Sequence, residues 1–306
     1  MSWKKLKKQY YIIVEKIKKK KNLFTDWLNF QTLTLQISKN PPQAIFEIQN
    51  SLEIIEKIKP KSKIRFFYHE CGGGLKVIYF AAIGYKNVYG VNVNFDVFLI
   101  NKILKTKFKV SEIRFLKTEG KNVPFKKNFF DFIISARVLE HLTDEEAFLC
   151  YSEEGRVLKE NGFAYHEVPH KYISYESYYR LWFIRFFPYF CKPFLYGLFL
   201  SIQKKKNLFS IDSFNADYFS KNFLILRSPH FHKKILIKNI ESFIDLNYNR
   251  LFREEDISSY DNDSPIILRK FIQKLFIIPL LGKFLALICK NFFIPQTLSK
   301  KVKNNL

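Results

Sequence analysis

An alternation of strand-like and helix-like segments between residues 64 and 168 constrains the fold of this chain more than any other feature. Short apolar or aromatic runs, typical of strands, are separated by longer stretches with helical periodicity. The expected strands cover residues 64–68, 87–93, 113–117, 130–135 and 162–168. The helix expected at 144–158 begins with a capping box formed by Thr143 and Glu146. Strands that alternate with helices form parallel βαβ units, so we predict an α/β domain with a doubly wound, mostly parallel sheet.

Three consecutive glycines, Gly72 to Gly74, follow the first expected strand in a chain that holds only 10 glycines. A glycine turn after a parallel strand lets the backbone approach a ligand closely, and the next helix directs its first amide groups at that ligand. Ligands of open parallel sheets bind beyond the carboxyl ends of the strands. The segment contains neither a G-x-G-x-x-G fingerprint nor a phosphate loop. We therefore predict a ligand site of another kind at this turn.

The two ends of the chain differ from this central region. Residues 1–40 are basic and predict a short amphipathic helix, either solvated or lying on an anionic surface. We expect no secretory signal there, because the apolar stretch at 10–14 is too short. The segment 271–295 is apolar but is interrupted by lysines, a proline and a glycine. Three alternatives stay open for it: an interfacial helix or helical hairpin, which we favour, a buried helix, and a membrane span.

The chain carries 51 lysines and arginines against 28 aspartates and glutamates, a net charge of +23. Such a charge favours anionic partners, for example nucleic acid, acidic lipid or phosphorylated substrates. A composition that is rich in lysine throughout, with no specific partner, explains the charge equally well. The four cysteines form no C-x-x-C pair. We therefore predict neither a disulfide framework nor a zinc knuckle, and a reducing cytoplasm fits.

Four motifs follow one another at residues 70–214. They are ECGGG at 70–74, a run at 116–142 that contains PF, FD and VLEHL, GRVLK followed by NG at 155–162, and NLFSIDSF at 207–214. Their order and spacing resemble the class I S-adenosylmethionine-dependent methyltransferases, in particular the small-molecule type, over about residues 64–227. The resemblance implies a Rossmann-like, seven-stranded sheet with helices on both faces and S-adenosylmethionine as the cofactor.

The resemblance also implies which residues contact the cofactor. Glu70 stands where the family has an acid that binds the methionine end, and a carboxylate suits the ammonium group there. Asn92 stands where the family has an acid that binds the ribose hydroxyls; its amide can still bond to them, without the strength of a charge. Glu119 takes the place of the acid that binds the adenine amino group. The complete set of expected cofactor-binding residues is Glu70, Gly72, Gly74, Asn92, Glu119 and Arg137.

Methyl transfer is an in-line displacement, for which an enzyme supplies proximity, orientation and, for some acceptors, a base. We expect His141 and His170 to be catalytic, because each follows a strand at the cofactor edge and histidine titrates near neutral pH. A structural role in its loop stays open for His141, and His166 and Glu167 are further candidates. Some relatives bind a metal through an E-x-x-E-H motif. No metal is predicted here, because Arg137 occupies its first position.

We expect three parts in the chain: a basic helical extension at 1–40, a methyltransferase domain at 41–250 and an apolar-basic helical tail at 251–306. An aromatic, lid-like insertion at 170–206 interrupts the domain. The predicted function is methylation of a small-molecule, sugar, lipid or quinone-like acceptor in the cytoplasm, with peripheral membrane contact through the tail. A non-catalytic protein of this fold and an RNA-modifying methyltransferase stay open as alternatives. The chain shows no pattern of an RNA-binding module, so we do not expect a nucleic-acid partner.

Overall fold

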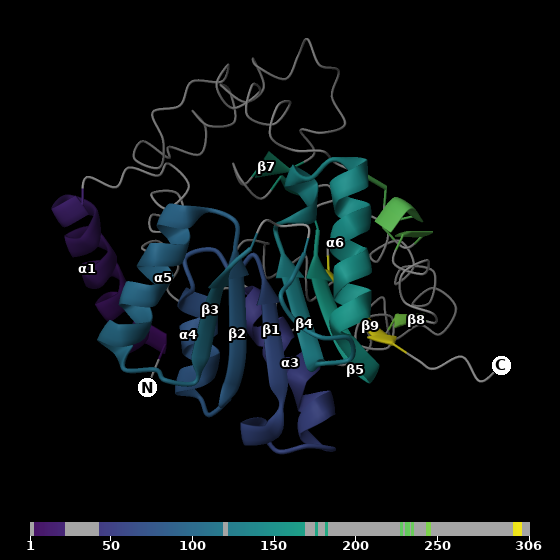
Figure 1. Cartoon of the computed structure of the whole chain (residues 1–306), viewed down its shortest axis with the longest axis horizontal. Coiled ribbons are helices and arrows are strands. Elements are labelled where there is room, and N and C mark those ends of the chain that lie inside the picture. The colour runs from purple at the N-terminus through teal and green to yellow at the C-terminus, as the bar shows by residue number, and fades with distance from the viewer. Residues whose placement is uncertain are drawn as a thin grey trace, which may run out of the picture.

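The structure, a computed structural model of the chain, describes most of residues 3–168 and several short segments after them (Figure 1). The described residues are 3–21, 43–118, 122–168, 175–176, 181–182, 227–228, 230–232, 234–235, 243–245 and 296–301. Most of the predicted aromatic insertion and most of the predicted tail lie outside these residues. The roles that we predict for them therefore stay predictions.

A seven-stranded sheet with the order β3-β2-β1-β4-β5-β9-β8 forms the centre of the domain (Figure 1). Its strands are β1 (Arg65–His69), β2 (Asn87–Asn92), β3 (Ile113–Lys117), β4 (Phe130–Ala136), β5 (Leu158–Glu167), β8 (Phe243–Asp245) and β9 (Gln296–Lys301). The strands β1 to β5 pair in parallel, whereas β9 pairs antiparallel with both β5 and β8. A separate antiparallel ribbon consists of β6 (Tyr175–Glu176) and β7 (Leu181–Trp182). The predicted Rossmann-like, mostly parallel sheet is confirmed.

Helices pack on both faces of the sheet and divide its core into two clusters. One cluster includes α1 (Trp3–Lys21), α3 (Gln43–Glu56), α4 (Leu75–Ala82) and α5 (Phe95–Phe108), and the other includes α6 (Asp144–Val157). Successive side chains of β1 alternate between the two clusters, since Phe66 and Tyr68 belong to the first and Phe67 to the second. The helix α6 begins at the predicted capping box of Thr143 and Glu146. None of the described helices is long and apolar enough to cross a membrane.

Both of the predicted extensions contribute to the domain itself. The basic N-terminal helix is confirmed as α1, but its apolar side chains lie in the core against α4 and α5 rather than on an anionic surface. They are Trp3, Leu6, Tyr10 and Val14. We expected residues 251–306 to be helical, whereas residues 296–301 form strand β9 beside β5. The sequence QTLSKK of β9 has no apolar alternation, which is why the pattern did not reveal a strand there. The sheet thus includes residues outside the predicted domain limits of 41–250.

Candidate functional site

The loop between β1 and α4 carries the three glycines, and its backbone takes a conformation that glycine adopts freely. Gly72 has a φ of 54°, and Gly74, the residue before α4, has a φ of 73°. A Cβ atom at Gly74 would lie 2.5 Å from Asn101 Oδ1 and 3.2 Å from the Phe115 ring. Glycine is therefore required at position 74 both by the left-handed backbone and by the close approach of α5 and β3.

Side chains from three other elements bind the carbonyl groups of this loop. The Asn101 side chain on α5 donates to the Gly72 carbonyl oxygen at 2.9 Å, and Asn92 at the end of β2 donates to the same oxygen at 3.3 Å. The hydroxyl group of Tyr10 on α1 donates to the Gly73 carbonyl oxygen at 2.6 Å. Asn92 is buried, so at least its amide nitrogen stabilises the loop itself. Its predicted contact with a ribose stays a prediction.

Glu70 lies between β1 and the glycines and has a φ of 52°. Its Oε2 accepts a hydrogen bond from the Val93 backbone amide at 3.3 Å. Its Oε1 is buried and has no hydrogen-bond partner among the described residues. Burial raises the pKa of this carboxyl group, although the charge of the neighbouring His69 opposes the rise. A buried carboxylate oxygen without a donor is suited to a cationic ligand.

A second polar group lies at the carboxyl ends of β4 and β5. Arg137, with a φ of 63°, donates from Nε to Glu167 Oε1 at 2.7 Å. Within the described part of the chain, the buried Oε2 of Glu167 has no hydrogen-bond partner. Burial alone would raise the pKa of Glu167, but the charges of Arg137 and Lys76 outweigh burial and lower it. Glu167 is therefore a carboxylate at neutral pH. The ammonium group of Lys76, on α4, donates to the Tyr68 hydroxyl at 3.2 Å.

The histidines singled out from the sequence lie in different surroundings. His141 is exposed at the end of the 3₁₀ helix η2 (Leu139–His141), and its catalytic role stays a prediction. His166 is buried beneath α6, where its Nε2 lies 2.7 Å from Glu154 Oε2. The predicted residues His170 and Glu119 lie outside the described residues.

Sequence reasoning missed three residues that support the loop and the polar group: Tyr10, Lys76 and Asn101. Tyr10 and Asn101 reach the glycine loop from helices that are distant in the chain, and no local pattern marks them. Lys76 had a signal, because it lies in the first turn of the helix that follows the glycines. A basic side chain at that position is close to any ligand bound beyond the strand ends.

Comparison with protein families agrees with this arrangement. Residues 70–166 match a family model described as a methyltransferase domain. Residues 70–166 are therefore similar to a methyltransferase domain, in agreement with the predicted family. The matched range begins at Glu70 and ends within β5, so it includes the glycine loop. The match supports the predicted methyltransferase domain over these residues. Compared with curated protein sequences, the chain has no significant match.

Solved structures are similar to this chain at low sequence identity. PKMT2 from Rickettsia typhi, in complex with AdoHcy, is 14% identical with a TM-score of 0.51, over 81% of this chain and 50% of that one. Phosphoethanolamine N-methyltransferase 2 from Haemonchus contortus, in complex with S-adenosyl-L-methionine, is 17% identical with a TM-score of 0.44, over 83% and 52%. The PH0226 protein from Pyrococcus horikoshii OT3 is 20% identical with a TM-score of 0.34, over 42% and 58%. This chain thus spans 50–58% of the length of these three proteins.

Proposed function

We propose that this protein transfers a methyl group from S-adenosylmethionine to a small-molecule, sugar, lipid or quinone-like acceptor. The observation that carries the proposal is the buried Oε1 of Glu70, which has no donor in the described part of the chain and lies at the glycine loop of a methyltransferase domain. The ammonium group at the methionine end of the cofactor supplies the missing donor. The residues present at this loop therefore fit the cofactor.

The residues around the loop have separate tasks in binding. Glu70 binds the ammonium group, and Gly72 and Gly74 bring the backbone close to the ligand because they add no side chains at this turn. Asn92 presents its amide oxygen to the ribose hydroxyls while its nitrogen bonds to the loop. When bound, the cofactor supplies a methyl group on an activated sulfonium. The full proposed set is Glu70, Gly72, Gly74, Asn92, Glu119 and Arg137.

Glu167 is the described residue whose chemistry best suits an acceptor with a hydroxyl or amine group. One of its carboxylate oxygens is fixed by Arg137, and the other has no hydrogen-bond partner in the described residues. The lowered pKa of Glu167 keeps its carboxylate ionised. The carboxylate therefore accepts a hydrogen bond from the hydroxyl or amine group of the substrate and orients this nucleophile for in-line attack. The carboxylate of Glu167 is a weak base because its pKa is low. We therefore propose His141 and His170 as the residues that remove the proton from the substrate.

The test is the transfer of labelled methyl from S-adenosylmethionine into a cell extract that is separated into polar metabolites, lipids and RNA. We expect the wild type to label a small molecule, and Glu167→Gln to label it about tenfold less or weaker still. The affinity for S-adenosylhomocysteine should change less than the activity, because Glu167 acts on the acceptor directly and on the cofactor only through Arg137. Glu160→Gln, at an exposed position of the same strand, is the control and should retain full activity. Label confined to RNA, or absent from every fraction with the wild type, would contradict the proposed acceptor.

A further inference from the structure

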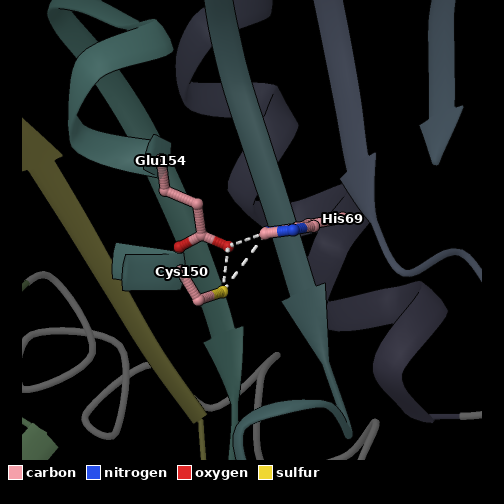
Figure 2. A group of neighbouring side chains, drawn as sticks. All are labelled: His69, Cys150 and Glu154. Carbon is pink, nitrogen blue, oxygen red and sulfur yellow. Dashed lines mark hydrogen bonds and ion pairs between the residues drawn. The ribbon is translucent and has the colours of Figure 1, made fainter. Parts of the chain in front are cut away.

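A buried cluster of ionisable side chains lies between the sheet and α6. His69 comes from the end of β1, Cys150 and Glu154 from successive turns of α6, and His166 from β5. Each of the four side chains is at most 2% exposed. Figure 2 shows the side chains of His69, Cys150 and Glu154 pointing toward one another. Because side chains alternate along a strand, this cluster lies on the opposite face of the sheet from Glu167 and is not used in the proposed methyl transfer.

Three different ligand atoms converge in this cluster. His69 Nδ1 lies 2.7 Å from Glu154 Oε1, and Cys150 Sγ lies 3.4 Å from the same nitrogen and 3.7 Å from the same oxygen. All three atoms lie within 4.8 Å of one another. The second oxygen of Glu154 is 2.7 Å from His166 Nε2. His166 therefore fixes the carboxylate so that its other oxygen faces His69 and Cys150.

The charges of the cluster are those of a site that can exchange protons for a cation. Burial would raise the pKa of Glu154, but the two histidines outweigh burial and lower it to about 2. Burial would lower the pKa of His69, but Cys150 and Glu154 outweigh burial and raise it. Burial raises the pKa of the Cys150 thiol to about 11. These shifts favour an imidazolium at His69, a carboxylate at Glu154 and a neutral thiol at Cys150.

The spacing of the ligand atoms is close to that of a tetrahedral metal site. Zinc bonds of about 2.0–2.3 Å at tetrahedral angles place ligand atoms about 3.3–3.6 Å apart. The two distances from Cys150 Sγ, 3.4 and 3.7 Å, agree with this spacing. The distance between His69 and Glu154 is shorter because a proton joins them, and it would open by about 0.6 Å around an ion. A mixed nitrogen, sulfur and oxygen set suits Zn²⁺ among the divalent ions.

We propose that His69, Cys150 and Glu154 bind one Zn²⁺ ion, with His166 as a positioning residue that orients the Glu154 carboxylate. Binding releases two protons, one from the Cys150 thiol and one from His69 Nδ1. The ion then faces a thiolate, a carboxylate and a neutral imidazole, so the buried site has no net charge.

The ion cross-links the end of β1 to two turns of α6. His69 directly precedes Glu70, so the cross-link fixes the strand end from which the proposed cofactor ligand projects. Since the ligands are buried, the ion enters as the chain folds, and its binding free energy adds to the stability of the domain. The zinc site does not depend on the proposed function, because it involves none of the proposed cofactor residues.

The test is a metal titration of the whole protein. The wild type is unfolded with a chelator under reducing conditions and then refolded in the presence of increasing Co²⁺, because the buried ligands take up the ion as the chain folds. Co²⁺ reports on thiolate ligands by its absorption. We expect one Co²⁺ per chain, a thiolate-to-cobalt charge-transfer band, and displacement of the band by Zn²⁺. A wild type that develops no charge-transfer band with Co²⁺ overturns the proposal, whatever the behaviour of any variant.

Variants assign the ligands. Cys150→Ser should abolish the band, whereas Cys71→Ser, which removes another buried thiol, should keep it. His166→Gln should keep the band but weaken Co²⁺ binding about 10–100-fold, as expected for a residue that acts through a ligand. A band that persists in Cys150→Ser, or that disappears in Cys71→Ser, overturns the assignment.

Discussion

The substitution Gly74→Ala adds one methyl group at the tightest point of the glycine loop. The left-handed φ of 73° costs an alanine about 1–2 kcal/mol. The new Cβ atom would also lie 2.5 Å from Asn101 Oδ1, so Asn101 must move. Its hydrogen bond to the Gly72 carbonyl would then be lost, at about 1 kcal/mol. We expect the free energy of unfolding to fall by about 2–3 kcal/mol in total.

Gly84→Ala is the matched control for this substitution. Gly84 also has a positive φ, 111°, but an added Cβ atom would meet nothing within 4 Å. Urea unfolding measures the stability of both variants, and calorimetry measures their affinity for S-adenosylhomocysteine. Gly84→Ala should lose stability through backbone strain and keep its cofactor affinity, whereas Gly74→Ala should lose both. A Gly74→Ala protein with wild-type stability or wild-type cofactor affinity would refute the reasoning.

Three further predictions concern the supports of the domain. Tyr10→Phe removes the hydroxyl that bonds to the Gly73 carbonyl, so urea unfolding should show a loss of about 1 kcal/mol. Asn92→Asp turns a donor into an acceptor beside the Gly72 carbonyl, so it should cost about 1–3 kcal/mol and weaken binding of S-adenosylhomocysteine. Although burial opposes the shift, a backbone amide and two lysines lower the pKa of Asp131 below its ordinary 3.8. Its stabilising effect is complete above pH 3.8 and is lost as the pH falls through the lower folded pKa, so acid titration of stability should be flatter in Asp131→Asn.

Each of these predictions has a control and a contradicting outcome. Tyr11→Phe, one residue along α1, should leave the free energy of unfolding unchanged. If both tyrosine variants lose the same stability, the hydrogen bond from Tyr10 to the loop does not stabilise the domain. Asn87→Asp alters an exposed bond to the Ser62 carbonyl at the other end of β2 and should cost little. Tighter cofactor binding by Asn92→Asp would contradict the prediction, because it would show that Asn92 does not substitute for the acid that the family has at this position. Glu145→Gln, at an exposed position, should leave the acid titration unchanged. If the stability of Asp131→Asn and that of the wild type fall identically with decreasing pH, the lowered pKa of Asp131 does not contribute to stability.

Features that depend on near neighbours in the chain could be predicted from the sequence. The capping box at Thr143 joins residues three positions apart, and the strand–glycine–helix order around Gly72 is continuous in sequence. The alternation of Phe66, Phe67 and Tyr68 between two cores follows from the period of a strand. These local signals agree with one another, which is why they were sufficient to predict the parallel sheet and the glycine loop after its first strand.

Contacts between distant parts of the chain could not be predicted. The amphipathic pattern of α1 predicts a helix but does not say that its buried face packs on α4 and α5. Strand β9 is polar and is recognised only by its pairing with β5. The sequence predicts that Asn92 lies at the end of its strand, beside the cofactor site. It does not predict that the side chain turns toward the loop after β1, where it donates to the Gly72 carbonyl oxygen.

The buried cluster under α6 combines residues that are near one another in the chain with residues that are distant. Cys150 and Glu154 are four residues apart, so they predictably share one face of a helix. His69 lies more than 80 residues earlier, as the separations of its contacts with Cys150 and Glu154 show. Only the pairing of β1, β4 and β5 brings it to that face. A spacing pattern along the chain therefore could not reveal the proposed zinc site.

Calorimetric titration of Glu70→Gln with S-adenosylhomocysteine tests the role of the glycine loop most directly. The substitution keeps the size of the side chain and removes the charge that we assign to the ammonium group. Loss of a charge-assisted hydrogen bond of about 1.5–3 kcal/mol predicts binding about 10–150-fold weaker than that of the wild type. Glu145→Gln should bind as the wild type does. No heat from the wild type at high micromolar ligand, or equal affinities for the wild type and Glu70→Gln, would contradict a cofactor site at this loop.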